Sequence, residues 1–427
     1  MPVLFCRSSE QHFYMLKYIF VILLFLFSGF NTSGKSIEYE DTIQGFRFDR
    51  NQRSVRIPAK ISNNLVVLPI QINDSPPLFF IIDTGVNTTI LTEPAIARFF
   101  DFSIDEVVYV LGLGNEGIVE AGMSKGLTFK MRGITGHNMN LIIIPEGILN
   151  FSEYFGFPVH GIIGNDLFSR FPVKVNYRTN TVRVYREPTY RIRRRSHIIP
   201  IEFENNKPYV EVVIEGDNEI KQDTMQLLVD IGATNPVFLN SSYKDLTEQR
   251  IPAFLGKGLS GELEGEMGRL KKISIGEIEI EEPLVAYPNH DFMDASNIRF
   301  QWEGILGAGI LSRFHVIIDY PSSKLILRKN PDFKKDFHSN LSGIDIIAKG
   351  LNFNEFVVNH VRKNSVAFEA GIKAGDKLIS VNRDPLTGMN IDEVVGILNQ
   401  SAGTVIQLQL QRNNKLYQKT IRLREDI

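Results

Sequence analysis

Two aspartates stand in tight turns that follow apolar strands. Segment 79–85 reads Phe-Phe-Ile-Ile-Asp-Thr-Gly, and segment 227–232 reads Leu-Leu-Val-Asp-Ile-Gly. If Asp83 and Asp230 face each other, their carboxyl groups cannot both ionise and must share a proton. Such a pair can deprotonate a bound water for attack on a peptide carbonyl and protonate the departing nitrogen, with neither a metal nor a covalent intermediate.

The elements that must position these aspartates form an internal repeat over residues 55–330. Farther along each copy, a Gly-apolar-apolar-Gly turn at 161–164 or 304–307 leads into Leu-Phe-Ser-Arg-Phe or Ile-Leu-Ser-Arg-Phe. β-branched and aromatic residues dominate the strand segments, and long amphipathic helices are scarce. We therefore predict a mainly β protein in which each copy forms a β-barrel-like lobe carrying one aspartate.

The glycines after the aspartates fit a close approach of the two turns, because a Cβ atom there would collide. Together with the segments Thr88-Thr89-Ile90-Leu91 and Val237-Phe238-Leu239, these motifs resemble those of the aspartic proteases, both pepsin-like and retroviral-type. The resemblance spans both lobes. It implies that Asp83 and Asp230 are catalytic, and that the dyad is supported by Thr84, Gly85, Ile231, Gly232, Gly164 and Gly307.

Two positions depart from that family's pattern. The residue after each catalytic aspartate is usually Thr or Ser, whose hydroxyl braces the dyad across the lobes, whereas the second lobe carries Ile231. Val86 stands where pepsin-like enzymes often have a serine that hydrogen-bonds the carboxylate. Two functions therefore stay open: an aspartic endopeptidase, or a catalytically degenerate relative that acts as a peptide-binding or scaffolding protein.

A flap over the cleft is expected between Val107 and Gly122. Tyr109 is its candidate aromatic residue, with ordinary strand packing as the alternative. The glycines of a flexible hairpin tip would be Gly112, Gly114 and Gly117. Residues 112–117 also match a dinucleotide fingerprint formally, but that motif needs a helix directly afterwards, and 118–126 is interrupted by glycine.

The C-terminal segment resembles a PDZ domain. Its motifs are Ser-Val-Ala at 365–367, Ala-Gly at 370–371 and Gly-Asp-Lys-Leu-Ile at 375–379. The resemblance implies binding of extended peptides beside a groove strand, with backbone N–H groups capturing a terminal carboxylate. Because the loop must precede the groove strand at 345–348, we assign the peptide-binding loop to Leu341, Ser342, Gly343 and Ile344.

Composition narrows the remaining possibilities. A net charge of −2 gives no broad footprint for nucleic acid, and the basic run at Arg191, Arg193, Arg194 and Arg195 is interpreted as a solvated linker between domains. The histidines lack metal-ligand spacing, so no metal or other cofactor is expected. The expected partners are peptide or protein substrates and C-terminal peptides at the PDZ domain.

The N-terminus has the layout of a secretory signal peptide. Lys17 precedes an apolar run at 18–27 that is too short to cross a bilayer, and small or polar residues follow. We expect an exported protein of the periplasm, cell surface or extracellular space. The predicted organisation is an N-terminal extension and signal peptide at 1–34, lobes at 35–190 and 191–330, a linker at 331–340 and a PDZ domain at 341–427.

Overall fold

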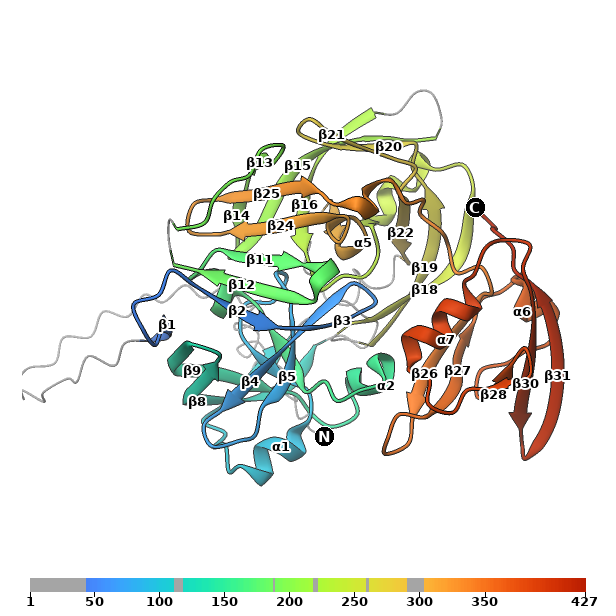
Figure 1. Ribbon diagram of the computed structural model, residues 1–427, viewed down its shortest axis with the longest axis horizontal. Helices are drawn as coiled ribbons and strands as arrows, with labels where there is room; N and C mark the ends of the chain where they lie inside the picture. Colours follow the sequence, from blue (N-terminus) through green and yellow to red (C-terminus); the bar gives the residue numbers. More distant parts are fainter. Residues whose placement is uncertain (1–43, 111–117, 187–188, 218–221, 259–260, 290–302) are drawn as a thin grey trace, which may run out of the picture.

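The computed structural model describes residues 44–110, 118–186, 189–217, 222–258, 261–289 and 303–427, and most of these lie in β-strands (Figure 1). The predicted signal peptide and the three candidate flap glycines lie outside the described residues. Within the described ranges, no helix combines the length and apolar character needed to span a bilayer.

The first lobe is built on a nine-stranded sheet with the order β1-β9-β6-β10-β5-β4-β8-β7 and with β3 beside β4. Its strands are β1 (Gly45–Phe48), β3 (Lys60–Ser62), β4 (Leu65–Ile72), β5 (Leu78–Ile82), β6 (Ile90–Leu91), β7 (Glu106–Val110), β8 (Val119–Met131), β9 (Ile134–Ile143) and β10 (Gly161–Ile163). Its short helices are α1 (Pro94–Phe99), α2 (Phe151–Phe155) and α3 (Asn165–Phe168).

The second lobe is built on a ten-stranded sheet with the order β18-β19-β22-β17-β23-β16-β15-β20-β21 and with β14 beside β15. Its strands are β14 (Glu202–Glu204), β15 (Lys207–Glu215), β16 (Gln222–Asp230), β17 (Val237–Leu239), β18 (Arg250–Gly258), β19 (Gly261–Arg269), β20 (Lys272–Ile275), β21 (Ile278–Glu281), β22 (Leu284–Pro288) and β23 (Gly304–Gly307). Helices α5 (Ala308–Leu311) and the 3-10 helix η2 (Ser241–Leu246) flank it.

The repeated sequence segments occupy equivalent places in the two sheets. In the first, β10 pairs parallel with β5 and antiparallel with β6, and β6 pairs parallel with β9. In the second, β23 pairs parallel with β16 and antiparallel with β17, and β17 pairs parallel with β22. Each aspartate therefore leaves the carboxyl end of a strand that is bordered by the Gly-apolar-apolar-Gly strand of the same lobe.

A third sheet joins the lobes. Its order is β13-β25-β24-β11-β12-β2, and the junction is the antiparallel pair β11–β24, where Val173 faces Ile318. The strands are β2 (Ser54–Pro58), β11 (Val173–Asn176), β12 (Thr181–Tyr185), β13 (His197–Pro200), β24 (Phe314–Asp319) and β25 (Lys324–Lys329), with the 3-10 helix η1 (Tyr177–Thr179) between β11 and β12. One face of this sheet is apolar and belongs to a core cluster that extends through both lobes.

The C-terminal domain forms a separate sheet with the order β26-β27-β28-β30-β31 and its own apolar core. Its strands are β26 (Ile344–Lys349), β27 (Glu355–Val361), β28 (Lys377–Val381), β29 (Asp384–Pro385), β30 (Val405–Arg412) and β31 (Lys415–Arg422), and its helices are α6 (Val366–Glu369) and α7 (Ile391–Leu398). Asn390 and Glu393 form a capping box at the start of α7.

The segment predicted as a polar linker, 331–340, packs against the second lobe. It begins with the 3-10 helix η3 (Pro331–Lys334). Phe337 is 6% exposed and belongs to the core shared by the lobes, while the Arg313 guanidinium lies 3.3 Å from the centre of its ring. The predicted linker is therefore packed against the lobes at Phe337. Sequence reasoning missed this packing because a single aromatic among charged residues gives no periodic signal.

Replacing Phe337 with alanine tests whether the segment is part of the folded unit. We expect a loss of about 3 kcal/mol in the free energy of unfolding, because a buried ring and its packing are removed. Chemical denaturation of Phe337→Ala, compared with Leu351→Ala at a fully exposed position, measures this difference. Equal stability of the two variants would contradict the assignment.

Candidate functional site

Asp83 and Asp230 come together where the two lobes meet. Asp83 directly follows β5, and Asp230 is the last residue of β16. The two carboxyl groups are hydrogen-bonded to each other. Each also accepts a bond from the backbone two residues on: Gly85 N donates to Asp83 Oδ1 at 2.6 Å, and Gly232 N donates to Asp230 Oδ1 at 2.7 Å. Equivalent turns thus present the carboxyls face to face.

The glycines after the aspartates make this approach possible. A Cβ atom on Gly85 would lie 3.1 Å from Asp230 Oδ2 and 3.1 Å from Asp83 Oδ1, and one on Gly232 would overlap the Asp83 carboxyl group. Because any larger residue at position 232 would displace the carboxyl of the opposite lobe, glycine is a steric requirement of the pair.

Gly164 and Gly307 allow close packing of backbone against the two aspartate turns. A Cβ on Gly164 would overlap the carbonyl oxygen of Val86, and one on Gly307 would overlap the carbonyl oxygen of Asn235. Each glycine therefore lets the Gly-apolar-apolar-Gly strand press against the backbone just beyond its lobe's aspartate.

A buried hydroxyl ties the two turns together. Thr84 Oγ1 donates to the carbonyl oxygen of Val229 at 2.6 Å and accepts from the backbone N–H of Ile231 at 3.2 Å. Ile231 is fully buried and contributes a side chain to the shared core instead of a reciprocal hydroxyl. The side-chain hydroxyl that ties the two aspartate turns together thus comes from the first lobe. From the second lobe, the Tyr320 hydroxyl donates to the carbonyl oxygen of Thr84 at 3.4 Å.

Burial and mutual repulsion set the protonation of the pair. Burial, followed by the charge of Asp230, raises the pKa of Asp83 well above its ordinary value. Burial also raises the pKa of Asp230, but hydrogen bonds from Gly232 N–H and from Asp83 oppose that effect. The nearby Lys207 lowers both pKa values. The pKa values of both carboxyls are thus raised, and the pair shares one proton.

The candidate flap is only partly described. Tyr109 lies on β7 and is 56% exposed, opposite Glu120 of β8 in an antiparallel hairpin. Gly112, Gly114 and Gly117 belong to the tip that lies outside the described residues. The chain continues from Val119 as strand β8, so the helix that a dinucleotide fingerprint requires is not formed there.

The predicted peptide-binding loop precedes the edge strand β26, and its backbone is engaged internally. Leu341 N donates to Asn399 Oδ1 at 2.9 Å, and Ile344 N donates to Ser342 Oγ at 3.2 Å. Gly343 N donates to Oδ1 of the preceding asparagine at 3.0 Å. Leu341 and Ser342 are buried. A terminal carboxylate at this loop would compete with these internal acceptors.

The groove beside β26 is covered by the first lobe. Helix α2 lies against β26 and α7 (Figure 1). A Cβ on Gly156, directly after α2, would lie 3.1 Å from Ile391 Cγ2 and 3.7 Å from Ala348 Cβ. Ile347 is 6% exposed, although it does not belong to the C-terminal domain's own core. Its neighbours Ile346 and Ala348 are the β26 residues that do. Ser62 Oγ adds a 2.7 Å bond to Asp392 Oδ1.

Adjacent residues of β27 contact different lobes. The Tyr154 hydroxyl of α2 is hydrogen-bonded to the Asn359 side chain, while the His360 ring stacks on Phe254 of β18 with 5.4 Å between centroids. Sequence reasoning missed these contacts because a Tyr, a Phe and a His at unrelated positions carry no motif. The described residues contain no group of three His, Cys, Asp or Glu side chains that could hold a metal ion.

The comparisons with known proteins concern the C-terminal region. A family model for the PDZ domain matches residues 357–412, so the chain contains a PDZ domain, in agreement with the motifs at 365–379. A search of curated proteins finds no match for the chain.

Thr84→Val tests the brace across the lobes. The valine lacks the hydroxyl that bonds Val229 and Ile231, and it leaves buried backbone groups without partners, so we expect a loss of about 1–3 kcal/mol in the free energy of unfolding. Thr84→Ser keeps the hydroxyl and should retain most of that stability. Urea denaturation of both variants measures the difference, and a valine variant as stable as the serine variant would refute the brace.

Proposed function

We propose that the chain is an aspartic endopeptidase that cleaves peptide bonds with a water activated by Asp83 and Asp230. The observation that carries this proposal is the hydrogen-bonded pair of carboxyls, presented by equivalent turns of two equivalent sheets. A PDZ domain in the same chain supports peptides or proteins as partners.

The protonation of the pair defines the roles of its members. Asp230, ionised, takes a proton from a water held between the carboxyls, and the resulting hydroxide attacks the peptide carbonyl carbon. Asp83, protonated, first hydrogen-bonds the carbonyl oxygen and stabilises the negative charge that develops there. Asp230 then gives the proton it took from the water to the amide nitrogen, the C=O bond re-forms as the C–N bond breaks, and the carboxylic acid and amine products leave. Thr84 holds the two turns in register while this occurs.

Hydrolysis of an unfolded protein such as β-casein tests the activity. We expect the full chain to cleave it, pepstatin to inhibit cleavage, and Asp83→Asn and Asp230→Asn each to reduce the rate by at least about three orders of magnitude. Asp74→Asn, at an exposed turn of the first lobe, is the matched control and should keep full activity. A correctly folded wild-type chain that binds peptides without cleaving them would instead establish the degenerate, peptide-binding alternative.

The pH dependence of thermal stability in the Asp83→Asn variant tests the raised pKa of Asp83. Because the folded-state pKa of Asp83 lies above its unfolded value, the carboxyl destabilises the native state as pH rises above about 4. Asparagine does not ionise. Asp83→Asn should therefore unfold at a higher temperature than the wild type at neutral pH, and the difference should shrink toward zero in acid.

The PDZ domain is proposed to restrain access in addition to binding peptide. A peptide that adds as a strand to β26 must displace α2 and Gly156, which lie over that edge. Since Asn359 and His360 contact opposite lobes, binding at the groove would also loosen the contacts that hold α2 and β18 to the domain. Peptide capture and undocking of the PDZ domain from the lobes are thereby coupled.

Ser62→Ala combined with Tyr154→Phe removes two docking hydrogen bonds from the lobe side and leaves the PDZ sequence unchanged. We expect faster hydrogen exchange in peptides covering β26 and faster hydrolysis of β-casein, because the undocked state becomes more populated. Thr179→Ala, on the 3-10 helix η1, serves as the control. Slower exchange, or hydrolysis that falls in step with stability, would argue that the contacts only maintain the fold.

A further inference from the structure

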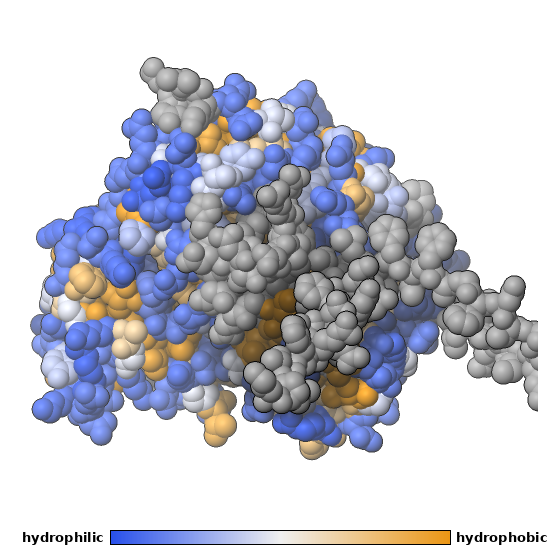
Figure 2. Space-filling view, turned by 180° about the vertical axis from the view of Figure 1, so that it is seen from behind, coloured by the Kyte–Doolittle hydropathy of each residue, from blue (hydrophilic) through white to orange (hydrophobic). Residues whose placement is uncertain are grey.

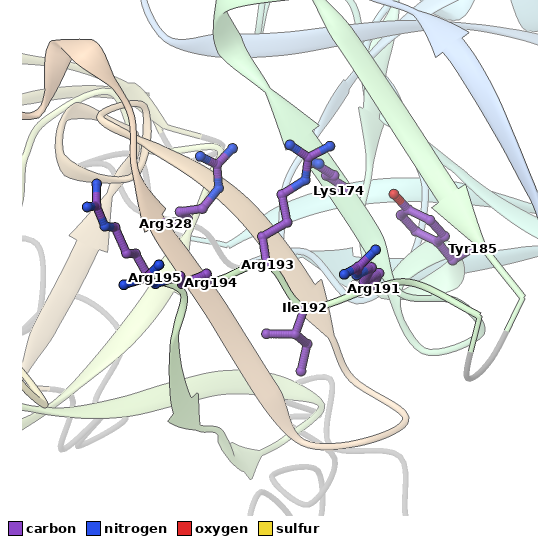
Figure 3. Close-up of a pocket in the computed structure, with 8 residues that line it drawn as sticks. All are labelled: Lys174, Tyr185, Arg191, Ile192, Arg193, Arg194, Arg195 and Arg328. Atoms are coloured by element: carbon purple, nitrogen blue, oxygen red, sulfur yellow. The ribbon is translucent and has the colours of Figure 1, made fainter.

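The basic run between the lobes, residues 191–195, is exposed as a solvated segment should be, but it also lies beside other cations. Residues 191–195 line a pocket of about 760 Å³ together with Lys174 of β11, Tyr185 of β12 and Arg328 of β25 (Figure 3). In Figure 3, the side chains of Lys174, Arg193 and Arg328 turn to the same side of the 191–195 segment, while Ile192 points away from them. Four separate parts of the chain therefore contribute to one basic hollow.

The sheet that joins the lobes presents this positive charge on its outer face. Its inner face is apolar, with Val173, Val175, Val182 and Val184 in the shared core. On the alternating outer positions, cations stand in cross-strand register, since Arg56 faces Arg183 and Arg183 faces Lys174. Arg328 faces His315 in the same sheet.

Such an arrangement costs stability in the absence of a counter-ion. Like charges directly opposite each other on neighbouring strands destabilise a sheet. Across the described part of the chain, the ion pairs include none of Lys174, Arg191, Arg193, Arg194, Arg195 and Arg328. Burial, and then the charges of Arg193 and Arg328, lower the pKa of Lys174. The pKa of His315 is lowered by burial and by the same cations.

We propose that this pocket binds a multivalent phosphate-bearing anion. Arginine forks match phosphate oxygens in paired hydrogen bonds, and several of them around one hollow favour a ligand with more than one negative charge. Tyr185, which also lines the pocket, adds a hydroxyl donor. The Asp83–Asp230 pair lies across the core on the other side of this sheet, so an anion here leaves the carboxyl pair uncovered.

Two probes distinguish a soluble phosphate ligand from a phosphate-bearing lipid headgroup. Inorganic tripolyphosphate represents a soluble ligand, and phosphatidylcholine vesicles containing phosphatidic acid represent a lipid headgroup, with vesicles of phosphatidylcholine alone as the blank. Titration calorimetry and vesicle sedimentation of the full chain measure the two. Binding of tripolyphosphate without vesicles indicates a soluble ligand, and binding of the acidic vesicles indicates a lipid; either supports the proposal.

Arg193→Gln combined with Arg328→Gln should weaken binding of the effective probe by about ten-fold for each arginine. Arg47→Gln with Lys130→Gln removes the same charge from exposed strand positions elsewhere and should weaken it far less. The pocket variant should also melt at a higher temperature than the wild type without ligand, since repulsion is relieved. Equal weakening by the two double variants, or no binding of either probe by the wild type, would overturn the proposal.

Discussion

The contact between the half-buried Asp83 carboxyl and the buried Asp230 carboxyl constrains more of this molecule than any other interaction. Both charges cannot exist at that distance, so one proton must be held in the pair. The two aspartate turns can approach this closely only with glycine at 85 and 232. The Thr84 hydroxyl, bonded to the opposite lobe, keeps the turns together. Tyr320, directly after β24 of the sheet that joins the lobes, adds a hydrogen bond to the backbone of the first turn at Thr84.

Much of this arrangement could be read from the sequence, because the repeated motifs encode local geometry. An apolar strand, an aspartate and a glycine at fixed spacing predict a turn, and two copies predict two equivalent turns. The PDZ motifs likewise specify backbone turns, such as the one at Gly375, where φ is +87°. Short sequence motifs therefore suffice to predict turns whose geometry depends on neighbouring residues.

Contacts between distant surfaces could not be read in the same way. Phe337, Tyr154 and Phe254 each pack against a partner far away in the sequence, and a lone aromatic carries no periodicity that predicts its partner. The basic run at 191–195 was visible, but its meaning depended on strands β11 and β25, whose register brings Lys174 and Arg328 beside it. Composition shows that the segment is basic, but only the fold shows that Lys174 and Arg328 lie beside it.

The sheet that joins the lobes also bears on the order in which the chain can acquire its structure during synthesis. Strand β11 pairs on one side with β12, its immediate neighbour in the chain, and on the other with β24, which emerges only after nearly all of the second lobe. Until then, the first lobe has an open strand edge, the kind of surface that recruits other extended chains. A ribosome that pauses within residues 189–313 would leave that edge exposed for longer, so the interval before β24 appears is the period of greatest aggregation hazard for the nascent protein.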